Sequence, residues 1–160
     1  MPYHYRVTED EKGLESLTLP QQNYLEGIAD LIRESGRARV TDLAAKLQVR
    51  MPSVTESIKR LAAMGLVARR AWHEIVLTPR GRRIATQLDD RHRALREFMC
   101  GIMAMDADRA NKLACRVEHC VDRRFAAQLA RLAELLRKRH PEVLRDLGQR
   151  LRAASGSTGG

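Results

Sequence analysis

The stretch TDLAAKLQVRMPSVTESIKRL, residues 41–61, has the pattern of two short helices joined by a tight turn. Thr41 is a suitable N-cap for the first helix, and Pro52 fits the first turn of the second. Residues 48–51 break the helical spacing of apolar side chains, and Gly65 marks the end of the second helix. Two short helices joined in this way form a helix-turn-helix, whose second helix enters the major groove of DNA.

The segments on either side of this stretch complete a winged helix. Before it, apolar side chains recur at helical spacing between Pro20 and Gly36, at Tyr24, Leu25, Ile28, Leu31 and Ile32. After it, residues 66–71 and 75–78 are rich in β-forming side chains, and the short connection between them predicts a hairpin. A helix-turn-helix followed directly by a hairpin is a winged helix.

Helices dominate the rest of the chain. Thr78 and Pro79 form an N-cap and first-turn pair for a long helix that reaches about Met103. Asp106 is a suitable N-cap for the next helix, and His140-Pro141 interrupts the apolar stripe that follows. We therefore predict a mainly α chain: a winged helix-turn-helix DNA-binding domain followed by an all-helical dimerisation domain.

Basic residues are concentrated around the helix-turn-helix. The chain has 160 residues and a net charge of +9, and residues 33–83 alone contain 12 basic and 4 acidic residues, a net +8. Charge alone fits a solvated surface equally well. The helix-turn-helix within the block favours DNA binding, because clustered Arg and Lys release counterions from DNA phosphates.

Other features exclude several classes of protein. Three cysteines, an odd number, argue against a disulfide-built secreted domain, so we expect a reducing cytoplasm. The sequence has no apolar run typical of a signal peptide or a membrane-spanning helix. Motifs such as a Gly-rich phosphate loop, a nucleophile elbow, HExxH and CxxC are absent from it. We therefore expect neither an enzyme nor a small organic substrate.

The second helix of the helix-turn-helix supplies a candidate DNA-reading surface. When Val54, Ile58 and Leu61 face the core, the polar side chains between them face outward. Hydroxyl groups bond bases or phosphates, glutamate accepts from cytosine, and arginine favours guanine or phosphate. The candidate DNA-binding residues are Arg37, Arg39, Arg50, Pro52, Ser53, Thr55, Glu56, Lys59, Arg60, Arg69 and Arg70.

A second group of residues combines thiol, carboxylate and imidazole side chains. In Cys115-Arg-Val-Glu-His119 they stand at i, i+3 and i+4, on one face of a helix. Softer transition metals use these donors. Asn23 and Glu26 in the first helix and His92 in the long helix would join them if the three helices pack together. Each residue taken singly has an ordinary structural explanation, but jointly Asn23, Glu26, His92, Cys115, Glu118 and His119 favour a metal site, with Asp122 as an outer partner.

These motifs resemble the diphtheria toxin repressor family of metal-dependent repressors, and most closely its short, two-domain manganese transport regulators. The resemblance covers about residues 21–138. It rests on the order and spacing of Asn23-Tyr-Leu-Glu26, Arg37-Ala-Arg-Val-Thr-Asp-Leu-Ala-Ala44, Pro52-Ser-Val-Thr55, Gly65-Leu-Val67, Val76-Leu-Thr-Pro-Arg-Gly81, Arg91-His92-Arg93 and Cys115-Arg-Val-Glu-His119. It implies a homodimer that binds a double-stranded DNA operator when a metal ion is bound where the two domains meet.

The ligand set implied by the resemblance mixes two metal types. Glu26 is of the manganese type, Cys115 is of the iron type, and Asn23 is of neither. The resemblance also implies that the iron type's ancillary site is absent, because Arg96 and Asn111 replace its glutamate and histidine. A thiolate favours Fe(II), Co(II) or Zn(II), and an added carboxylate favours Mn(II). We expect Mn²⁺ or Fe²⁺, with Zn²⁺ or Co²⁺ as further candidates.

The sequence predicts four segments and one function. We predict a flexible arm over residues 1–18, the winged-helix domain over 19–86, a helical metal-binding and dimerisation domain over 87–152, whose last helix spans 141–152, and a disordered tail over 153–160. The predicted function is a cytoplasmic, metal-dependent repressor of genes for metal-ion uptake or homeostasis. Two alternatives stay open: a winged-helix regulator that has lost metal control, which Asn23 favours, and a metal-buffering interaction module.

Overall fold

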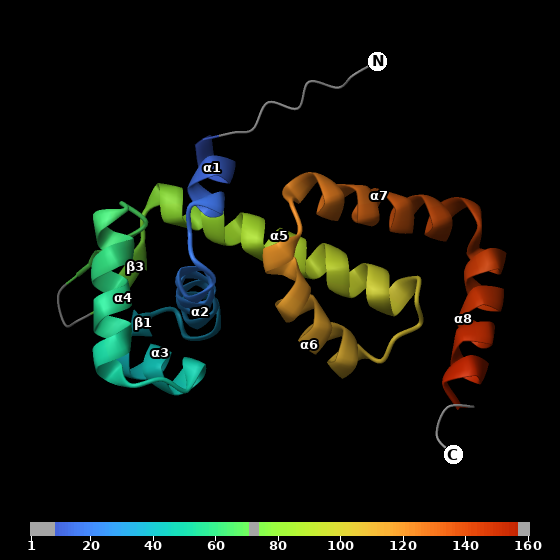
Figure 1. Ribbon diagram of the computed structural model, residues 1–160, viewed down its shortest axis with the longest axis horizontal. Helices are drawn as coiled ribbons and strands as arrows, with labels where there is room; N and C mark the ends of the chain where they lie inside the picture. The colour runs from blue at the N-terminus through green and yellow to red at the C-terminus, as the bar shows by residue number, and fades with distance from the viewer. Residues whose placement is uncertain (1–8, 71–73, 157–160) are drawn as a thin grey trace. The chain divides into compact units, whose positions relative to one another are not determined.

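The computed structural model describes residues 9–70 and 74–156. The chain divides into two compact units, Met1–Leu88 and Asp89–Gly160. Helix α5, Pro79–Gly101, begins in the first unit and ends in the second (Figure 1). Among the described residues, no helix combines the length and the apolar character that crossing a bilayer requires.

The first helix of the winged-helix unit is α2, Leu19–Ser35. Its start is held by Gln21, whose Oε1 accepts a hydrogen bond from the Thr18 backbone N–H at 2.9 Å. Its end is set by Gly36, which takes a left-handed conformation with φ of 74°. Gly27 lets α2 approach the next helix closely, because a Cβ there would lie 2.8 Å from Leu43 Cδ1.

The predicted helix-turn-helix is confirmed in α3, Val40–Leu47, and α4, Met51–Ala63. The turn begins at Gln48, which is left-handed with φ of 54°, and Gly65 follows α4 with φ of 70°. Leu43, Val54, Ile58 and Leu61 are fully buried, as their spacing predicted. Thr41 is not the N-cap: α3 begins at Val40, and Arg39, two residues before Thr41, occupies the cap position.

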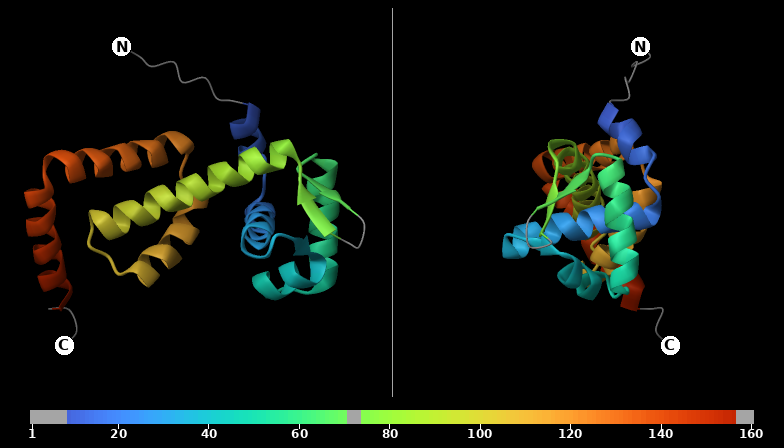
Figure 2. Two further views of the ribbon diagram at one scale, coloured as in Figure 1. Left: turned by 180° about the vertical axis from the view of Figure 1, so that it is seen from behind. Right: turned by 90° about the vertical axis from the view of Figure 1, so that its left-hand side faces the viewer.

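A small antiparallel sheet forms the wing. Strands β2, Val67–Arg69, and β3, Glu74–Leu77, make the predicted hairpin, with Val67 opposite Leu77 (Figure 2). Strand β1, Ala38–Arg39, adds to the other edge of β3 and was not predicted. The predicted connection includes Trp72 and His73, which lie outside the described residues.

The first turn of helix α5 packs against the wing. Thr78 caps it, because its Oγ1 accepts from the Gly81 N–H at 3.0 Å. A Cβ at Gly81 would lie 1.9 Å from the Leu66 carbonyl oxygen, so only glycine fits this close approach. The predicted N-cap and first-turn pair at Thr78 and Pro79 is therefore confirmed.

The described part of the predicted flexible arm is ordered. Residues Glu9–Glu15 form helix α1, and Leu14 and Leu17 are buried in the core of the first unit. Asp10 binds Arg83 of α5, with Oδ2 2.7 Å from Nε. The prediction of a flexible arm is wrong for residues 9–17, because two leucines and one ion pair hold this segment against the core.

The second unit contains the end of α5 together with α6, Ala107–Val117, a 3₁₀ turn η2, Glu118–Cys120, α7, Arg123–Arg139, and α8, Pro141–Gly156. Asp106 caps α6 as predicted, accepting from two backbone N–H groups. Asp122 caps α7 by accepting from the Phe125 N–H. Helix α8 ends at Gly156, so residues 153–156 of the predicted disordered tail are helical.

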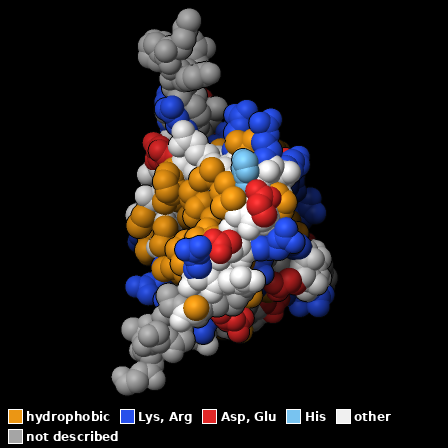
Figure 3. Space-filling view, turned by 90° about the vertical axis from the view of Figure 1, so that its right-hand side faces the viewer, with side chains coloured by type: hydrophobic (Ala, Val, Ile, Leu, Met, Phe, Trp, Pro, Cys, Tyr) orange, Lys and Arg blue, Asp and Glu red, His pale blue; other side chains and the backbone are white. Residues whose placement is uncertain are grey.

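The second unit exposes a set of large apolar side chains. Figure 3 shows hydrophobic side chains gathered on one face of the molecule. Phe125, Leu132 and Leu135 of α7 are each between 46% and 48% exposed, and Val143 of α8 is 49% exposed. We call these four residues the apolar face; apolar faces of this kind often mark an interface with another protein.

Candidate metal centre

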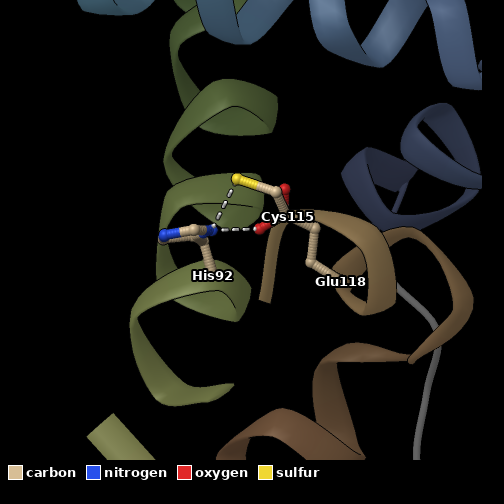
Figure 4. Close-up of side chains that lie close together, drawn as sticks. All are labelled: His92, Cys115 and Glu118. Atoms are coloured by element: carbon tan, nitrogen blue, oxygen red, sulfur yellow. Dashed lines mark hydrogen bonds and ion pairs between the residues drawn. The ribbon is translucent and has the colours of Figure 1, made fainter. Parts of the chain in front are cut away.

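Three elements of the second unit bring a thiol, an imidazole and a carboxylate together (Figure 4). Helix α5 carries His92, α6 carries Cys115 and η2 carries Glu118. His92 Nδ1 lies 2.7 Å from Glu118 Oε2 and 3.7 Å from Cys115 Sγ. One donor atom from each residue lies within 4.8 Å of the others, a spacing at which all three could bind one ion.

Small residues on α6 create this proximity. Ala110 and Ala114 are fully buried and pack with Leu95 and Met99 of α5 in the core of the second unit. Leu95 lies one turn from His92 along α5, so this core holds α6 beside the part of α5 that carries His92. Cys115, which follows Ala114, is thereby presented to His92.

The end of α6 differs from the prediction of one helix through His119. The α-helix stops at Val117, and Glu118–Cys120 form a 3₁₀ turn. Cys115 and Glu118 still face the same side, because residues three apart remain aligned when the last turn tightens. The prediction that they share one face is confirmed by their common contact with His92, although the helix type was wrong.

Glu118 is the most buried member of the cluster, with 3% of its surface exposed. A buried carboxylate is costly without a partner, and here the imidazoles of His92 and His119 lie beside it. His119 Nε2 lies 3.6 Å from Glu118 Oε1, and its side chain is 10% exposed. Burial lowers the pKa of His119, opposed by the Glu118 carboxylate and assisted by Arg91 and His92.

The other two predicted ligands lie in the first unit. Asn23 and Glu26 stand one helical turn apart on α2, where Asn23 is exposed and Glu26 is half-buried. Their part in a metal site stays a prediction. The two other cysteines, Cys100 and Cys120, are not members of the cluster of His92, Cys115 and Glu118.

Sequence analysis overlooked one polar contact at the site. Asn111 Oδ1 lies 2.9 Å from His92 Nε2, the ring nitrogen that does not face the cluster. The spacing of Asn111, Cys115 and Glu118 at i, i+4 and i+7 could have indicated that Asn111 shares their side of α6. Asp122, which we expected as an outer partner of the site, instead caps α7.

The candidate DNA-binding residues lie exposed on the surface of the first unit, with one exception. Ten of the eleven are exposed, and Thr55 is half-buried on α4. Glu56 and Arg60 form an ion pair along α4, with Glu56 Oε1 3.3 Å from Arg60 Nε. The outward face of α4 therefore carries a carboxylate that is already matched to a neighbouring guanidinium.

The donor set fits a divalent transition metal. A neutral imidazole nitrogen, a thiolate sulfur and a carboxylate oxygen together suit Fe(II), Co(II), Zn(II) or Mn(II), whereas calcium and magnesium prefer oxygen alone. The buried Glu118 carboxylate supplies negative charge where an ion would lie. His92, Cys115 and Glu118 are thus chemically and geometrically able to hold such an ion.

The comparisons with known proteins agree with this chemistry. The N-terminal DNA-binding domain of the iron-dependent repressors matches residues 16–71, and their metal-binding and dimerisation domain matches residues 78–143. The HTH-type transcriptional regulator MntR of Geobacillus kaustophilus is 30% identical over 135 residues, covering 83% of this chain and 95% of that protein. The chain belongs to the iron-dependent repressor family.

Other proteins similar to this iron-dependent repressor family member match over a shorter span. The transcriptional regulator MntR of Escherichia coli O157:H7 is 38% identical over 99 residues, 62% of this chain and 63% of its own length. A solved structure of a manganese-dependent transcriptional repressor in complex with manganese aligns with a TM-score of 0.65 and 29% identity, covering 71% of this chain and 52% of that one. The chain therefore spans 63% of the length of the Escherichia coli regulator and 52% of the length of the solved repressor.

Proposed function

We propose that this chain is a metal-dependent, DNA-binding transcriptional repressor of genes for metal-ion uptake or homeostasis. The observation that carries the proposal is the meeting of His92, Cys115 and Glu118 in a chain that also has a winged helix. Neither feature alone would indicate regulation. Together they provide a sensor and a DNA-reading head in one polypeptide, which would act in the cytoplasm where the DNA lies.

The second unit would provide the stable part of the metal site. His92, Cys115 and Glu118 are already close together, and His119 lies beside Glu118. Asn23 and Glu26 would add oxygen ligands from the DNA-binding unit. The ion, Mn²⁺ or Fe²⁺ with Zn²⁺ or Co²⁺ as further candidates, would supply positive charge that all these donors share. Metal binding would then depend on the position of the DNA-binding unit.

This arrangement supports a thermodynamic switch. If Asn23 and Glu26 can bind the ion only when the DNA-binding unit takes certain positions, metal binding raises the population of those positions. Couplings between two sites are typically about 1–3 kcal/mol, or roughly 5–150-fold in affinity. By reciprocity, operator DNA would tighten metal binding by the same factor.

The DNA contact would be made by α4 and the wing. Lys59 and Arg60 of α4 and Arg69 and Arg70 of the wing are exposed and basic. Phosphate contacts would position the unit, and Ser53, Thr55 and Glu56 would contact bases. A repressor that reads half-sites also needs a second copy, and the apolar face of α7 and α8 supports a homodimer.

The decisive experiment measures operator binding as a function of metal. Operator sequences would be selected from a random duplex library with Mn²⁺ present, and binding would be followed by fluorescence anisotropy with Mn²⁺, Fe²⁺, Zn²⁺, Co²⁺ or a chelator. We expect binding at least about fivefold tighter with the proper metal than with chelator. Equal affinity in every condition would contradict metal control and favour the winged-helix regulator without it.

Two variants make the experiment specific. Cys115→Ala removes the thiol of the cluster, and Cys120→Ala removes an exposed thiol two residues beyond Glu118. We expect the first to reduce the response to metal and the second to leave it unchanged. If no sequence is enriched over random duplex, the chain is not a repressor, and the metal-buffering module is the better account.

A further inference from the structure

Asn111 holds His92 from the side opposite the metal ligands. One ring nitrogen of His92, Nδ1, lies 2.7 Å from Glu118 and faces Cys115. The other, Nε2, lies 2.9 Å from Asn111 Oδ1. Figure 4 shows this second nitrogen pointing away from Cys115 and Glu118. The imidazole is therefore fixed at both nitrogens, one toward the cluster and one toward an amide.

The chemistry of the amide decides which nitrogen carries hydrogen. A carbonyl oxygen accepts hydrogen bonds and donates none, so the contact with Asn111 requires a hydrogen on Nε2. A neutral imidazole with hydrogen on Nε2 has its lone pair on Nδ1. In that tautomer the lone pair would face the cluster, where a metal ion needs it, while Glu118 Oε2, 2.7 Å from Nδ1, competes for the hydrogen.

Without Asn111 the opposite arrangement would be favoured. The buried Glu118 carboxylate is a strong acceptor only 2.7 Å from Nδ1, and it would attract the hydrogen to that nitrogen. Nδ1 would then be blocked as a ligand, and a metal ion would have to displace the hydrogen. The Asn111 carbonyl oxygen opposes this shift, because it can accept a hydrogen bond only when Nε2 carries hydrogen.

The position of Asn111 is rigid enough for this role. Asn111 is on α6, one turn before Cys115, so ligand and acceptor come from the same helix. Ala110 and Ala114 on either side of it are fully buried against α5. The helix start is held by Asp106, which accepts hydrogen bonds from the Asp108 and Arg109 N–H groups. The backbone that carries the short, exposed Asn111 side chain is therefore fixed beside the imidazole.

We infer that Asn111 is a positioning residue that accepts a hydrogen bond from Nε2 of His92 and so holds the ring with Nδ1 turned toward the cluster for a metal ion. The inference rests on the proposed function in that a metal ion is the ligand of Nδ1. Outer partners of metal-binding histidines typically change metal affinity about 10–100-fold when they are removed. Asn111 would thus affect metal binding without contacting the ion.

The first test needs no metal. Nitrogen chemical shifts of His92, from long-range ¹H–¹⁵N spectra of the metal-free protein at pH 8, report which ring nitrogen carries hydrogen. We expect hydrogen on Nε2 in the natural protein and a substantial fraction with hydrogen on Nδ1 in Asn111→Leu. The same pattern in both proteins would show that Asn111 does not control the ring.

The second test measures metal affinity. We expect Asn111→Leu to bind Co²⁺ and Mn²⁺ about 10–100-fold more weakly, with a changed visible spectrum of the Co²⁺ form. Asn111→Asp keeps an oxygen acceptor and should restore affinity to within a few-fold of the natural protein. Lys112→Leu, a change at the next, exposed position of α6, is the matched control and should leave affinity and spectrum unchanged.

The outcomes separate this inference from the proposed function. If the natural protein binds no divalent metal, the proposed function fails, while the metal-free spectra still decide the role of Asn111. If metal binds but Asn111→Leu binds it equally well, the positioning role is refuted and the metal site stands. If Asn111→Asp is as weak as Asn111→Leu, the effect comes from packing and the inference is again refuted.

Discussion

Glu118 places its Oε2 atom 2.7 Å from His92 Nδ1 and thereby joins η2 to α5 at the centre of the ligand cluster. Glu118 is almost completely buried, whereas the imidazole is 22% exposed. Any divalent ion bound by the cluster would lie beside this carboxylate. The pair consequently links two properties that can be measured apart, metal affinity and the stability of the second unit.

Replacing Glu118 tests its contribution to metal binding. Glu118→Gln keeps the size of the side chain and removes its charge, so metal affinity should fall by more than about 100-fold, the upper range for changes that leave the ligands in place. Isothermal titration with Mn²⁺ measures the effect. Glu97→Gln, in the exposed pair with Arg137 on α5 and α7, is the matched control. An unchanged affinity in Glu118→Gln would remove it from the ligand set.

Cys115 should determine which metal is preferred. A thiolate favours Co²⁺ and Zn²⁺ over Mn²⁺, so Cys115→Ala should weaken Co²⁺ and Zn²⁺ binding more than Mn²⁺ binding. The near-ultraviolet absorption of a sulfur–cobalt bond should be present in the natural protein and in Cys120→Ala, and absent in Cys115→Ala. A sulfur–cobalt band that survives in Cys115→Ala would place the ion on another thiol.

Glu56 should restrain DNA binding by the helix that carries it. Its carboxylate pairs with Arg60 and would repel phosphates, so Glu56→Gln should strengthen binding to random duplex DNA. If Arg60 then gains one phosphate contact, the slope of log affinity against log salt steepens by about 0.9. Glu134→Gln breaks a comparable pair with Lys138 on α7 and should change neither quantity. A weaker slope in Glu56→Gln would be the opposite of the expected result.

The apolar face should hold two copies together. Leu132 is 46% exposed on α7, so Leu132→Asp should leave the chain folded but place a charge in the interface. Sedimentation equilibrium should show a shift from dimer to monomer. Leu19→Asp changes a leucine that is 50% exposed in the first unit and should leave the dimer intact. A stable dimer of Leu132→Asp would place the interface elsewhere.

The contact of α1 with α5 should depend on pH. The hydrogen bond from Arg83, together with its charge, lowers the pKa of Asp10 below its ordinary value. A lowered pKa in the folded state stabilises the fold above the unfolded pKa of about 3.9, and this stabilisation disappears as the pH falls through the folded pKa. Asp10→Asn should therefore lower the urea midpoint at pH 7 by a small amount and have no effect near pH 2.

A second carboxylate on the same helix provides the comparison. Glu9 pairs with Lys12 within α1 rather than with α5, so Glu9→Gln should change the urea midpoint less than Asp10→Asn at pH 7. If Asp10→Asn loses stability equally at both pH values, the ion pair is not the cause.

The winged helix could be predicted because its sequence is locally consistent. Apolar residues at Val54, Ile58 and Leu61 mark one helical face, and Gly36 and Gly65 mark helix ends that require left-handed backbone. Helix α1 was missed for the opposite reason. A seven-residue helix with few apolar side chains has no recognisable period, and it is held by contacts with the core and with Arg83.

The proximity of Cys115 and Glu118 could be predicted from the sequence, and the rest of the cluster's geometry could not. Cys115 and Glu118 stand three residues apart, so their alignment follows from spacing alone. The contact between Asn111 and His92 joins residues 19 positions apart and depends on how α6 packs on α5. The 3₁₀ turn at Glu118 likewise depends on the chain direction into Asp122 and α7, which spacing does not describe.

Ala110 and Ala114 have a consequence for how such a protein could evolve. They are not ligands themselves, but they fill the core where α6 packs on α5, so their size would influence how far Cys115 lies from His92. Exchange of either alanine for glycine or serine would alter the distances within the cluster of His92, Cys115 and Glu118, while every donor atom stays the same. Selection for a larger or smaller ion could therefore act on two buried methyl groups, leaving the coordination chemistry untouched.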